Sequence, residues 1–317
     1  MLQFVMGRAG SGKTEYLRRM LADRSLAGQG GTVMIVPEQY TFETEKAMLR
    51  LAGPVRGNAI PVYSFTRLAE AVFRREGGAV GRRLSDGGRR ILMASAIEAC
   101  QDRLEVYASA AKGGRITDVM LTAVSEMKLC GIAPGDLQQA SRELGSTGLG
   151  KKLSELSLLY DTYNALVETS YLDSRDDLTR LAQALESSTF FRGCTVAVDS
   201  FEGFTAQELA VLTRILQKAD QVVVALCTDG LDRSGTGLFA LVDRTRARLS
   251  AAAKENGVEV LPPVMLTGAP RFRNENLKLM EAQLFSTSAP MTSEDGEGIA
   301  VFAARDTYEE AKYAAAE

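Results

Sequence analysis

The chain has 317 residues, more than one average domain, so one elaborated domain or two domains are expected. Its 37 basic and 40 acidic residues leave a formal net charge of −3, so any binding to nucleic acid must use local basic groups. Histidine is absent, which excludes serine–histidine triads, histidine general bases and histidine metal ligands.

The sequence also limits location and redox chemistry. The N-terminus lacks the basic, apolar pattern of a signal peptide, and no run is apolar for long enough to cross a bilayer. A cytoplasmic protein without membrane contact is therefore expected. The cysteines are far apart and show no C-x-x-C spacing, so we predict buried thiols and no metal cluster in this chain. They are Cys100, Cys130, Cys194 and Cys227.

The most specific motif comes first in the chain. An apolar run at residues 2–6 leads into a G-x-x-x-x-G-K-[ST] pattern, and a helical pattern follows. Such a loop turns its backbone N–H groups toward phosphate oxygens, and the helix directs its positive end to the same charge. We expect Lys13 to reach the β- and γ-phosphates of ATP and Thr14 to ligate Mg²⁺. A glycine-rich turn with a surface lysine is the simpler alternative. The predicted phosphate-binding loop (P-loop) consists of Gly7, Arg8, Ala9, Gly10, Ser11, Gly12, Lys13 and Thr14.

Strand and helix patterns alternate in the first 76 residues. Apolar, β-branched runs at residues 32–36 and 60–65 indicate strands, and each is followed by a helical pattern. This order predicts a parallel sheet with helices on both sides, that is, an α/β fold of the P-loop NTPase (RecA-like) type. Residues 1–76 are its first part.

Strand signals vanish between residues 77 and 190, where helical periodicity predicts an inserted all-helical subdomain. Two arginine pairs near its start, 82–83 and 89–90, could contact a phosphate backbone. A solvated helix face is the favoured interpretation for so short a cluster.

Strands return in residues 191–285, the predicted second part of the α/β domain. The run 194–198 ends in Asp199, and a carboxylate there is expected to fix Mg²⁺ through a bound water. An aspartate that merely starts a turn is the alternative. Thr205 and Glu208 predict a capping box for a helix over 205–218, and 221–226 is another buried strand.

The C-terminal residues predict the start of something larger. Residues 286–298 are rich in Ser, Thr, Gly and acids and indicate a linker. A strand over 299–303 and a helix over 307–317 would begin a second RecA-like domain. Because the chain stops inside that helix, an N-terminal part of a longer protein is expected.

Several of these stretches resemble one family in its own order. The chain is similar to the N-terminal, UvrD-like (superfamily-one) helicase region of the AddB subunits of AddAB helicase–nucleases. The resemblance spans essentially the whole chain, although only the P-loop is specific by itself. It rests on the P-loop, on V-P-E-Q-Y-T-F at 36–42, V-Y-S-F-T-R-L at 62–68, D-S-R-D-D-L at 173–178 and V-D-S-F-E-G-F-T at 198–205.

The departures from an active helicase suggest binding of ATP without efficient hydrolysis. Ser200 occupies the position of the glutamate that polarises the attacking water, and serine cannot act as that base at neutral pH. Asp199 and Glu202 are the remaining catalytic candidates, and the reach of Glu202 is doubtful. Residues 227–230 lack the G-D-x-x-Q sensor that couples the γ-phosphate to DNA. Arginine fingers would come from the second RecA-like domain.

The resemblance implies a role in repair of DNA double-strand breaks by recombination. It implies binding of single-stranded DNA, recognition of the Chi recombination hotspot, and a heterodimer with an AddA-type motor subunit. It places the nuclease and its iron–sulfur cluster in a C-terminal part beyond residue 317. Aromatic stacking and backbone hydrogen bonds suit a single strand. The strand-contact candidates are Gln39, Tyr40, Thr41, Tyr63, Ser64, Phe65, Thr66 and Arg67. Packing of Phe65 beneath the sheet is an equal alternative to strand contact.

Three other functions stay open at this point. In an active ATP-driven DNA helicase or translocase, Glu202 would replace the missing base. A P-loop small-molecule kinase would fit the first 75 residues, although compact kinases place their metal carboxylate much sooner. A structural scaffold with a vestigial loop would have no affinity for nucleotide.

Overall fold

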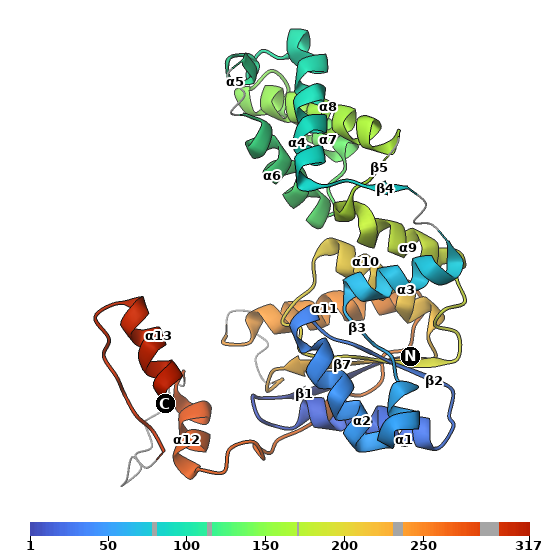
Figure 1. The fold of residues 1–317 in the computed structure, drawn as a ribbon, viewed down its shortest axis with the longest axis vertical. Helices are drawn as coiled ribbons and strands as arrows, with labels where there is room; N and C mark the ends of the chain where they lie inside the picture. Colours follow the sequence, from blue (N-terminus) through green and yellow to red (C-terminus); the bar gives the residue numbers. More distant parts are fainter. Residues whose placement is uncertain (78–80, 113–115, 170, 231–236, 286–297) are drawn as a thin grey trace.

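The structure, a computed structural model, describes residues 1–77, 81–112, 116–169, 171–230, 237–285 and 298–317 (Figure 1). Its centre is a parallel six-stranded sheet in the order β3-β2-β6-β7-β1-β8, which confirms the predicted α/β fold with a parallel sheet. The strands are β1 (Leu2–Gly7), β2 (Gly31–Ile35), β3 (Val62–Tyr63), β6 (Cys194–Val198), β7 (Gln221–Cys227) and β8 (Val264–Met265).

Helices cover both faces of this sheet, because the strands are apolar on both sides. Along β1, Val5 faces one layer while Phe4 and Met6 face the other. The first layer consists of α1 (Lys13–Leu26) and α2 (Thr41–Asn58), the latter preceded by the 3-10 turn η1 (Glu38–Tyr40). The second consists of α3 (Phe65–Glu76), α9 (Asp177–Ser187), α10 (Ala206–Lys218) and α11 (Ala240–Glu255).

A separate helical cluster projects from the sheet and has an apolar core of its own, around Met93, Leu159 and Tyr163 (Figure 1). Its helices are α4 (Asp86–Cys100), η2 (Gln101–Arg103), α5 (Ala108–Lys112), α6 (Ile116–Leu129), α7 (Pro134–Leu144) and α8 (Gly148–Glu168). Helix α9 packs instead on α3 and α10, so this cluster ends before α9 rather than at residue 190.

Two short parallel strands, β4 (Arg82–Arg83) and β5 (Tyr171–Leu172), join the cluster to the rest of the chain. No strands were expected here, because two residues are too few to show a period of two. The 3-10 turn η3 (Ser174–Asp176) follows β5 and leads into α9.

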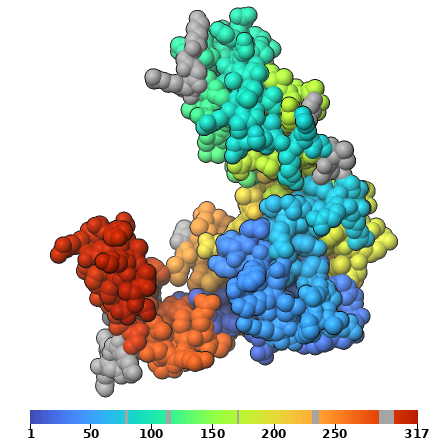
Figure 2. Space-filling view, in the orientation of Figure 1, coloured from blue at the N-terminus to red at the C-terminus, as the bar shows by residue number. Residues whose placement is uncertain are grey.

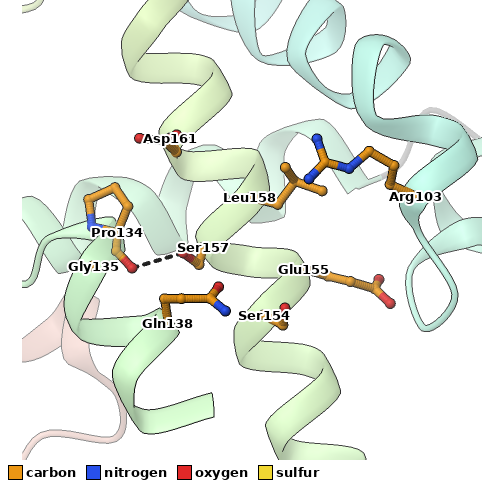
Figure 3. A pocket seen from close by; sticks show the side chains of 9 residues that line it. All are labelled: Arg103, Pro134, Gly135, Gln138, Ser154, Glu155, Ser157, Leu158 and Asp161. Atoms are coloured by element: carbon orange, nitrogen blue, oxygen red, sulfur yellow. Dashed lines mark hydrogen bonds between the residues drawn. The ribbon is translucent and has the colours of Figure 1, made fainter. Parts of the chain in front are cut away.

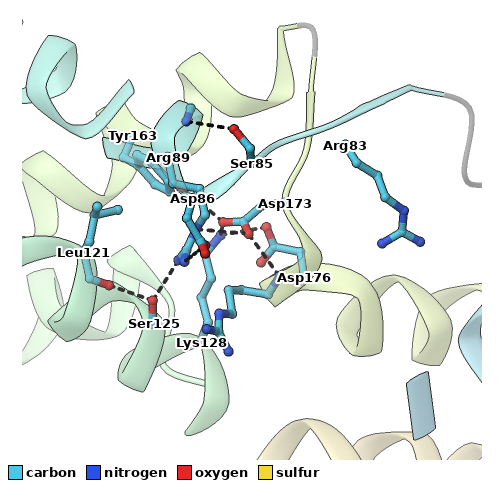
Figure 4. A network of polar contacts seen from close by, with 12 residues as sticks. Arg83, Ser85, Asp86, Arg89, Leu121, Ser125, Lys128, Tyr163, Asp173 and Asp176 are labelled. Atoms are coloured by element: carbon cyan, nitrogen blue, oxygen red, sulfur yellow. Dashed lines mark hydrogen bonds and ion pairs between the residues drawn. The ribbon is translucent and has the colours of Figure 1, made fainter. Parts of the chain in front are cut away.

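A buried ionic network lies beside this junction (Figure 4). The fully buried Asp173 carboxylate accepts hydrogen bonds from Lys128 Nζ (3.3 Å) and Tyr163 Oη (3.1 Å), and Arg89 Nε lies 3.4 Å from it. Lys128 also pairs with Asp176 at 2.6 Å. Burial alone would raise the pKa of Asp173, but Lys128 and the other cationic and hydrogen-bonding neighbours hold it below its usual value. Arg89 is therefore neither a phosphate contact nor part of a solvated face.

The C-terminal residues differ from the prediction. Helices α12 (Glu275–Gln283) and α13 (Thr307–Ala316) form, but residues 299–303 make no strand. A strand requires a hydrogen-bonded partner, and the described residues offer none there. Instead, the Phe302 ring stacks on Tyr313 with centroids 4.0 Å apart. Figure 2 shows this segment, in red, standing beside the sheet. Of the predicted linker 286–298, residues 286–297 lie outside the described part of the chain.

Candidate nucleotide-binding site

The loop of residues 7–14, called the glycine loop below, connects β1 to α1 and has a shape that requires glycine. Gly10 and Gly12 have φ angles of 77° and 91°, in the left-handed region. A Cβ atom on Gly7 would lie 2.4 Å from Ser11 Oγ and 2.5 Å from the carbonyl oxygen of Leu266. Gly12 gives α1 no side-chain cap, so the first N–H groups of this helix are free to face an anion.

Lys13 folds back over the glycine loop. Its Nζ donates hydrogen bonds to the carbonyl oxygens of Gly7 (2.7 Å) and Arg8 (2.8 Å). Burial lowers the pKa of Lys13, while the nearby Cys227 and Asp199 act in the opposite direction. The ammonium group is thus already partly removed from water at the place where the motif predicts phosphate oxygens.

Asp199 lies directly after β6, two strands from the glycine loop, since β7 separates β6 from β1. The distance is two strand spacings, about 10 Å. Its backbone N–H donates to Ile35 O (3.0 Å), and the residue is only 3% exposed. Nevertheless its Oδ2 has no hydrogen-bond partner among the described residues. A buried, unpartnered carboxylate oxygen is costly, and a hydrated cation would satisfy it.

The other two predicted residues lie at the edge of this arrangement. Thr14 occupies the first turn of α1, beside Lys13. Glu202 is exposed and lines a cavity of about 500 Å³ together with Arg8 and Ala9 of the glycine loop. The structure therefore brings Glu202 to the loop, at the mouth of an apolar cavity. The apolar lining comes mainly from Phe239, Phe272, Leu277, Met280, Leu284 and Phe285.

The Arg8 side chain turns away from the centre of the glycine loop. Its Nε pairs with Glu281 of α12 at 2.9 Å, its NH1 lies 3.8 Å from Asp229, and its guanidinium lies over the Phe239 ring. A role of Arg8 in phosphate binding therefore falls to its backbone.

A segment that no sequence pattern had marked as part of the site, residues 266–273, packs against the glycine loop. Leu266 N donates to Met6 O (2.8 Å), and Arg271 N donates to Gly10 O (3.2 Å). A Cβ atom on Gly10 would lie 2.8 Å from the Phe272 ring. The charge of Arg271 also lowers the pKa of Lys13, so a second cation stands near the loop. The signal in the sequence is two arginines, 271 and 273, a few residues after a strand.

Three of the eight strand-contact candidates have structural roles instead. Thr41 Oγ1 donates to Glu38 O (2.9 Å) at the start of α2. Ser64 caps α3 by accepting the N–H of Arg67 (3.2 Å). Phe65 is buried in the core beneath the sheet, in agreement with the alternative interpretation. The side chains of all three are buried, so direct contact with a strand is corrected for them.

The remaining five candidates line one edge of the sheet. Gln39, Tyr40 and Thr66 are exposed, and Tyr63 and Arg67 are half-buried. They follow β2 and β3, whose C-terminal ends are adjacent to that of β6 and hence to Asp199. Burial raises the pKa of Tyr63, which stays a neutral hydrogen-bonding phenol. Arg67 pairs with Glu45 at 2.8 Å on the surface.

A second cavity, of about 490 Å³, lies in the helical cluster between α7 and α8 (Figure 3). Glu155 on its wall accepts hydrogen bonds from the backbone N–H groups of Glu105, Val106 and Tyr107. Ser157 donates to Pro134 O, 2.8 Å away. These contacts hold the loop after η2 and the start of α7 in place, so the polar groups of this wall serve the fold.

The cysteines differ in their exposure. Only Cys100 is buried; Cys130 is exposed, and Cys194 and Cys227 are half-buried, so the prediction of four buried thiols was wrong. All four are free. In the part of the chain that the structure describes, no helix is long and apolar enough to span a bilayer.

Fold and site together define an α/β protein whose parallel sheet presents a glycine-rich loop and a buried, unpartnered carboxylate at one edge. Residues 4–281 match the family model described as ADDB, N-terminal, and the chain belongs to this family. This match confirms the resemblance found in the sequence.

Similar curated proteins are named as the AddB-type (B) component of an ATP-dependent helicase/deoxyribonuclease. That of Desulforudis audaxviator is 37% identical over 328 residues, covering 100% of this chain and 28% of the relative. That of Thermoanaerobacter sp. (strain X514) is 33% identical over 322 residues, with coverage of 100% and 28%. That of Caldanaerobacter subterraneus is 31% identical over 315 residues, with coverage of 98% and 27%. The chain thus spans about 28% of the length of these relatives.

Proposed function

We propose that this chain is the ATP-binding, helicase-like part of a helicase–nuclease subunit that processes DNA ends during double-strand-break repair. The observation that carries the proposal is the pair formed by Lys13 and Asp199. A partly desolvated lysine lies within a loop that only glycine can form, and a buried carboxylate oxygen without a partner among the described residues lies two strands away. This arrangement suits a P-loop NTPase of the RecA-like type, with Mg²⁺ bound between phosphate and protein.

Each residue would have a defined task in holding Mg²⁺–ATP. The backbone N–H groups of the glycine loop and the start of α1 would bind phosphate oxygens, and Lys13 would exchange its carbonyl partners for them. Thr14 and Asp199 would orient the hydrated cation. In the described residues no group of three carboxylates or thiols could hold a metal by itself, which suits a cation bound mainly by phosphate and water. Bound Mg²⁺ would neutralise phosphate charge.

Turnover is proposed to be slow, and the site to serve mainly for binding. The position after Asp199 is Ser200, which supplies no base, and Glu202 is exposed at the cavity mouth rather than enclosed with Asp199. The same edge of the sheet would hold single-stranded DNA through Gln39, Tyr40, Tyr63, Thr66 and Arg67. The Chi hotspot as the sequence read, an AddA-type motor as the partner and a nuclease elsewhere in the protein belong to the same proposal.

The first test is equilibrium binding of a fluorescent ATP analogue with Mg²⁺ to the chain and to its Lys13→Ala variant. Lys152→Ala, on the exposed surface of α8, is the matched control. Binding in the wild type and the control, with a loss of at least tenfold in Lys13→Ala and negligible hydrolysis on single-stranded DNA, is expected. Equal affinity of all three proteins would contradict a phosphate site at the glycine loop.

An active ATP-driven DNA motor is the second candidate, and one observation favours it. Glu202 lines the same cavity as Arg8 and Ala9, so a carboxylate does lie near the loop. In that case the chain would hydrolyse ATP faster on single-stranded DNA, and Glu202→Gln would abolish the stimulation while leaving nucleotide affinity unchanged. A rate unaffected by DNA would exclude this candidate.

A further inference from the structure

Three phenylalanine rings connect the strand-contact residues to the Asp199 loop. Phe65, the first residue of α3, meets Phe201 edge-on with ring centroids 5.5 Å apart. Its ring also lies 6.4 Å from that of Phe204, and Phe201 and Phe204 lie 5.1 Å apart. Edge-to-face contacts of this kind fix the mutual orientation of rings as well as burying them. We call these three residues the aromatic bridge.

The end of the bridge nearest Asp199 is under backbone strain. Ser200 has φ = 66°, and no other non-glycine residue in the described ranges has a positive φ. It joins Asp199 directly to Phe201. A turn about its backbone would move the carboxylate and the ring together, so the position of one constrains the position of the other.

The far end of this loop is anchored, which leaves Ser200 as the place where it can move. Thr205 and Glu208 form a capping box at the start of α10. Thr245 of α11 donates through Oγ1 to Glu202 O (3.2 Å). A displacement that starts at Asp199 therefore reaches Phe201 before it can reach the helices of the second layer.

We propose that Phe201 is a positioning residue that couples occupation of the nucleotide site to the affinity for single-stranded DNA. A cation or phosphate that engages Asp199 shifts the balance of the strained Ser200 backbone, and the Phe201 ring transmits this shift to Phe65 and the first turn of α3. Tyr63, Thr66 and Arg67 flank Phe65 and present the strand-contact surface. The inference rests on the proposed function, and it supplies a physical link at a site whose residues 227–230 contain no glutamine sensor.

The aromatic bridge suits this task because it is short and two-sided. Asp199 N bonds Ile35 O, and Val36 N bonds Tyr63 O, so the strand ends are also joined by a regular backbone ladder. That ladder is rigid and has one arrangement. The bridge, by contrast, begins at a residue with an unfavourable backbone conformation that a different loop position would relieve.

The test measures a coupling factor with the full chain. A fluorescent oligothymidylate is titrated with protein in the absence and presence of saturating Mg²⁺ and a non-hydrolysable ATP analogue, and the ratio of the two Kd values is the coupling factor. We expect a ratio that differs from one by at least fivefold in the wild type, within the usual range of coupling energies. The reverse titration must give the same factor, because coupling of binding is reciprocal.

The variant is Phe201→Leu, which keeps an apolar side chain but loses the edge contact to Phe65. Its coupling factor is expected to fall to within twofold of one, while each separate Kd changes by less than about threefold. Phe191→Leu is the control, because Phe191 lies in the same core but outside the aromatic bridge. It should keep the wild-type factor, and thermal unfolding should show that both variants are folded.

Each result separates the inference from the proposal beneath it. A Phe201→Leu variant with the wild-type factor, or a wild-type factor of one with both ligands bound, would overturn the coupling and leave the proposed function intact. Failure of the wild type to bind either ligand would overturn the proposed function together with the coupling.

Discussion

Two aspartates show how the two regions of this molecule differ. Asp173, beside the helical cluster, and Asp199, at the edge of the sheet, are both almost completely buried. Asp173 is surrounded by Lys128, Arg89 and Tyr163, whereas Oδ2 of Asp199 has no hydrogen-bond partner in the described ranges. A buried charge with partners belongs to the fold, and a buried charge without them indicates a ligand.

The largest effect is expected for Asp173→Asn. This change leaves Lys128 and Arg89 buried beside a neutral group, which should destabilise the protein by about 3–5 kcal/mol. Unfolding in urea, followed by circular dichroism, measures the loss. Asp102→Asn, in the exposed turn η2, is the control and should change stability little. A loss below about 1 kcal/mol in Asp173→Asn would show that the network contributes little to stability.

Acidification should reveal the same carboxylate. The pKa of Asp173 is lower in the folded protein than in the unfolded chain. Its contribution is therefore complete above the unfolded pKa, about 3.9, and is lost as the pH falls through the lower, folded pKa. Urea midpoints measured between neutral pH and pH 3 should fall more in the wild type than in Asp173→Asn. Parallel curves for the two proteins would contradict this assignment.

The opposite result is expected for Asp199→Asn. Because removal of an unpartnered charge relieves a burial cost, stability should stay within about 1 kcal/mol of the wild type or rise. Nucleotide binding should meanwhile lose its dependence on Mg²⁺. Titration of the ATP analogue with and without Mg²⁺ checks this, with Asp220→Asn at the exposed start of β7 as control. A destabilisation as large as that of Asp173→Asn would make Asp199 a structural residue.

The smallest effect concerns the strained neighbour of Asp199. Ser200→Gly removes the side chain that makes φ = 66° unfavourable, although glycine adds freedom to the unfolded chain. A net gain in stability of about 0.5–1 kcal/mol is expected. Thermal unfolding of the variant beside Ser25→Gly, which lies inside α1 and should be destabilised, tests the sign.

Local patterns were sufficient to predict much of this molecule. The glycine loop follows from the spacing of Gly7, Gly12 and Lys13, and the capping box of α10 follows from Thr205 and Glu208. The parallel sheet follows from the alternation of apolar runs with helical periods. All of these depend on residues close together in the chain, where geometry is set by a few dihedral angles.

The rest depends on contacts between distant residues. The approach of Arg271 to Gly10 spans most of the chain, and no periodicity reports it. Phe65 stands in a segment that looks exposed, yet its ring packs on Phe201 and Phe204. Residues 299–303 have a strand-like composition but lack a neighbouring strand among the described residues. Apolar character predicts burial or pairing, but the partner is decided by the whole fold.

The pairing of β4 with β5 has a consequence for how the sheet and the helical cluster fold together. The chain leaves toward the cluster at Arg82 and returns at Leu172, and these two points lie on adjacent strands. For the sheet, the entire cluster is therefore a loop with a narrow opening. The entropy of closing a loop grows only slowly with its length, and a cluster that folds on its own core brings its two ends together in advance. The helices can thus vary in length or sequence while the sheet still meets the same short gap.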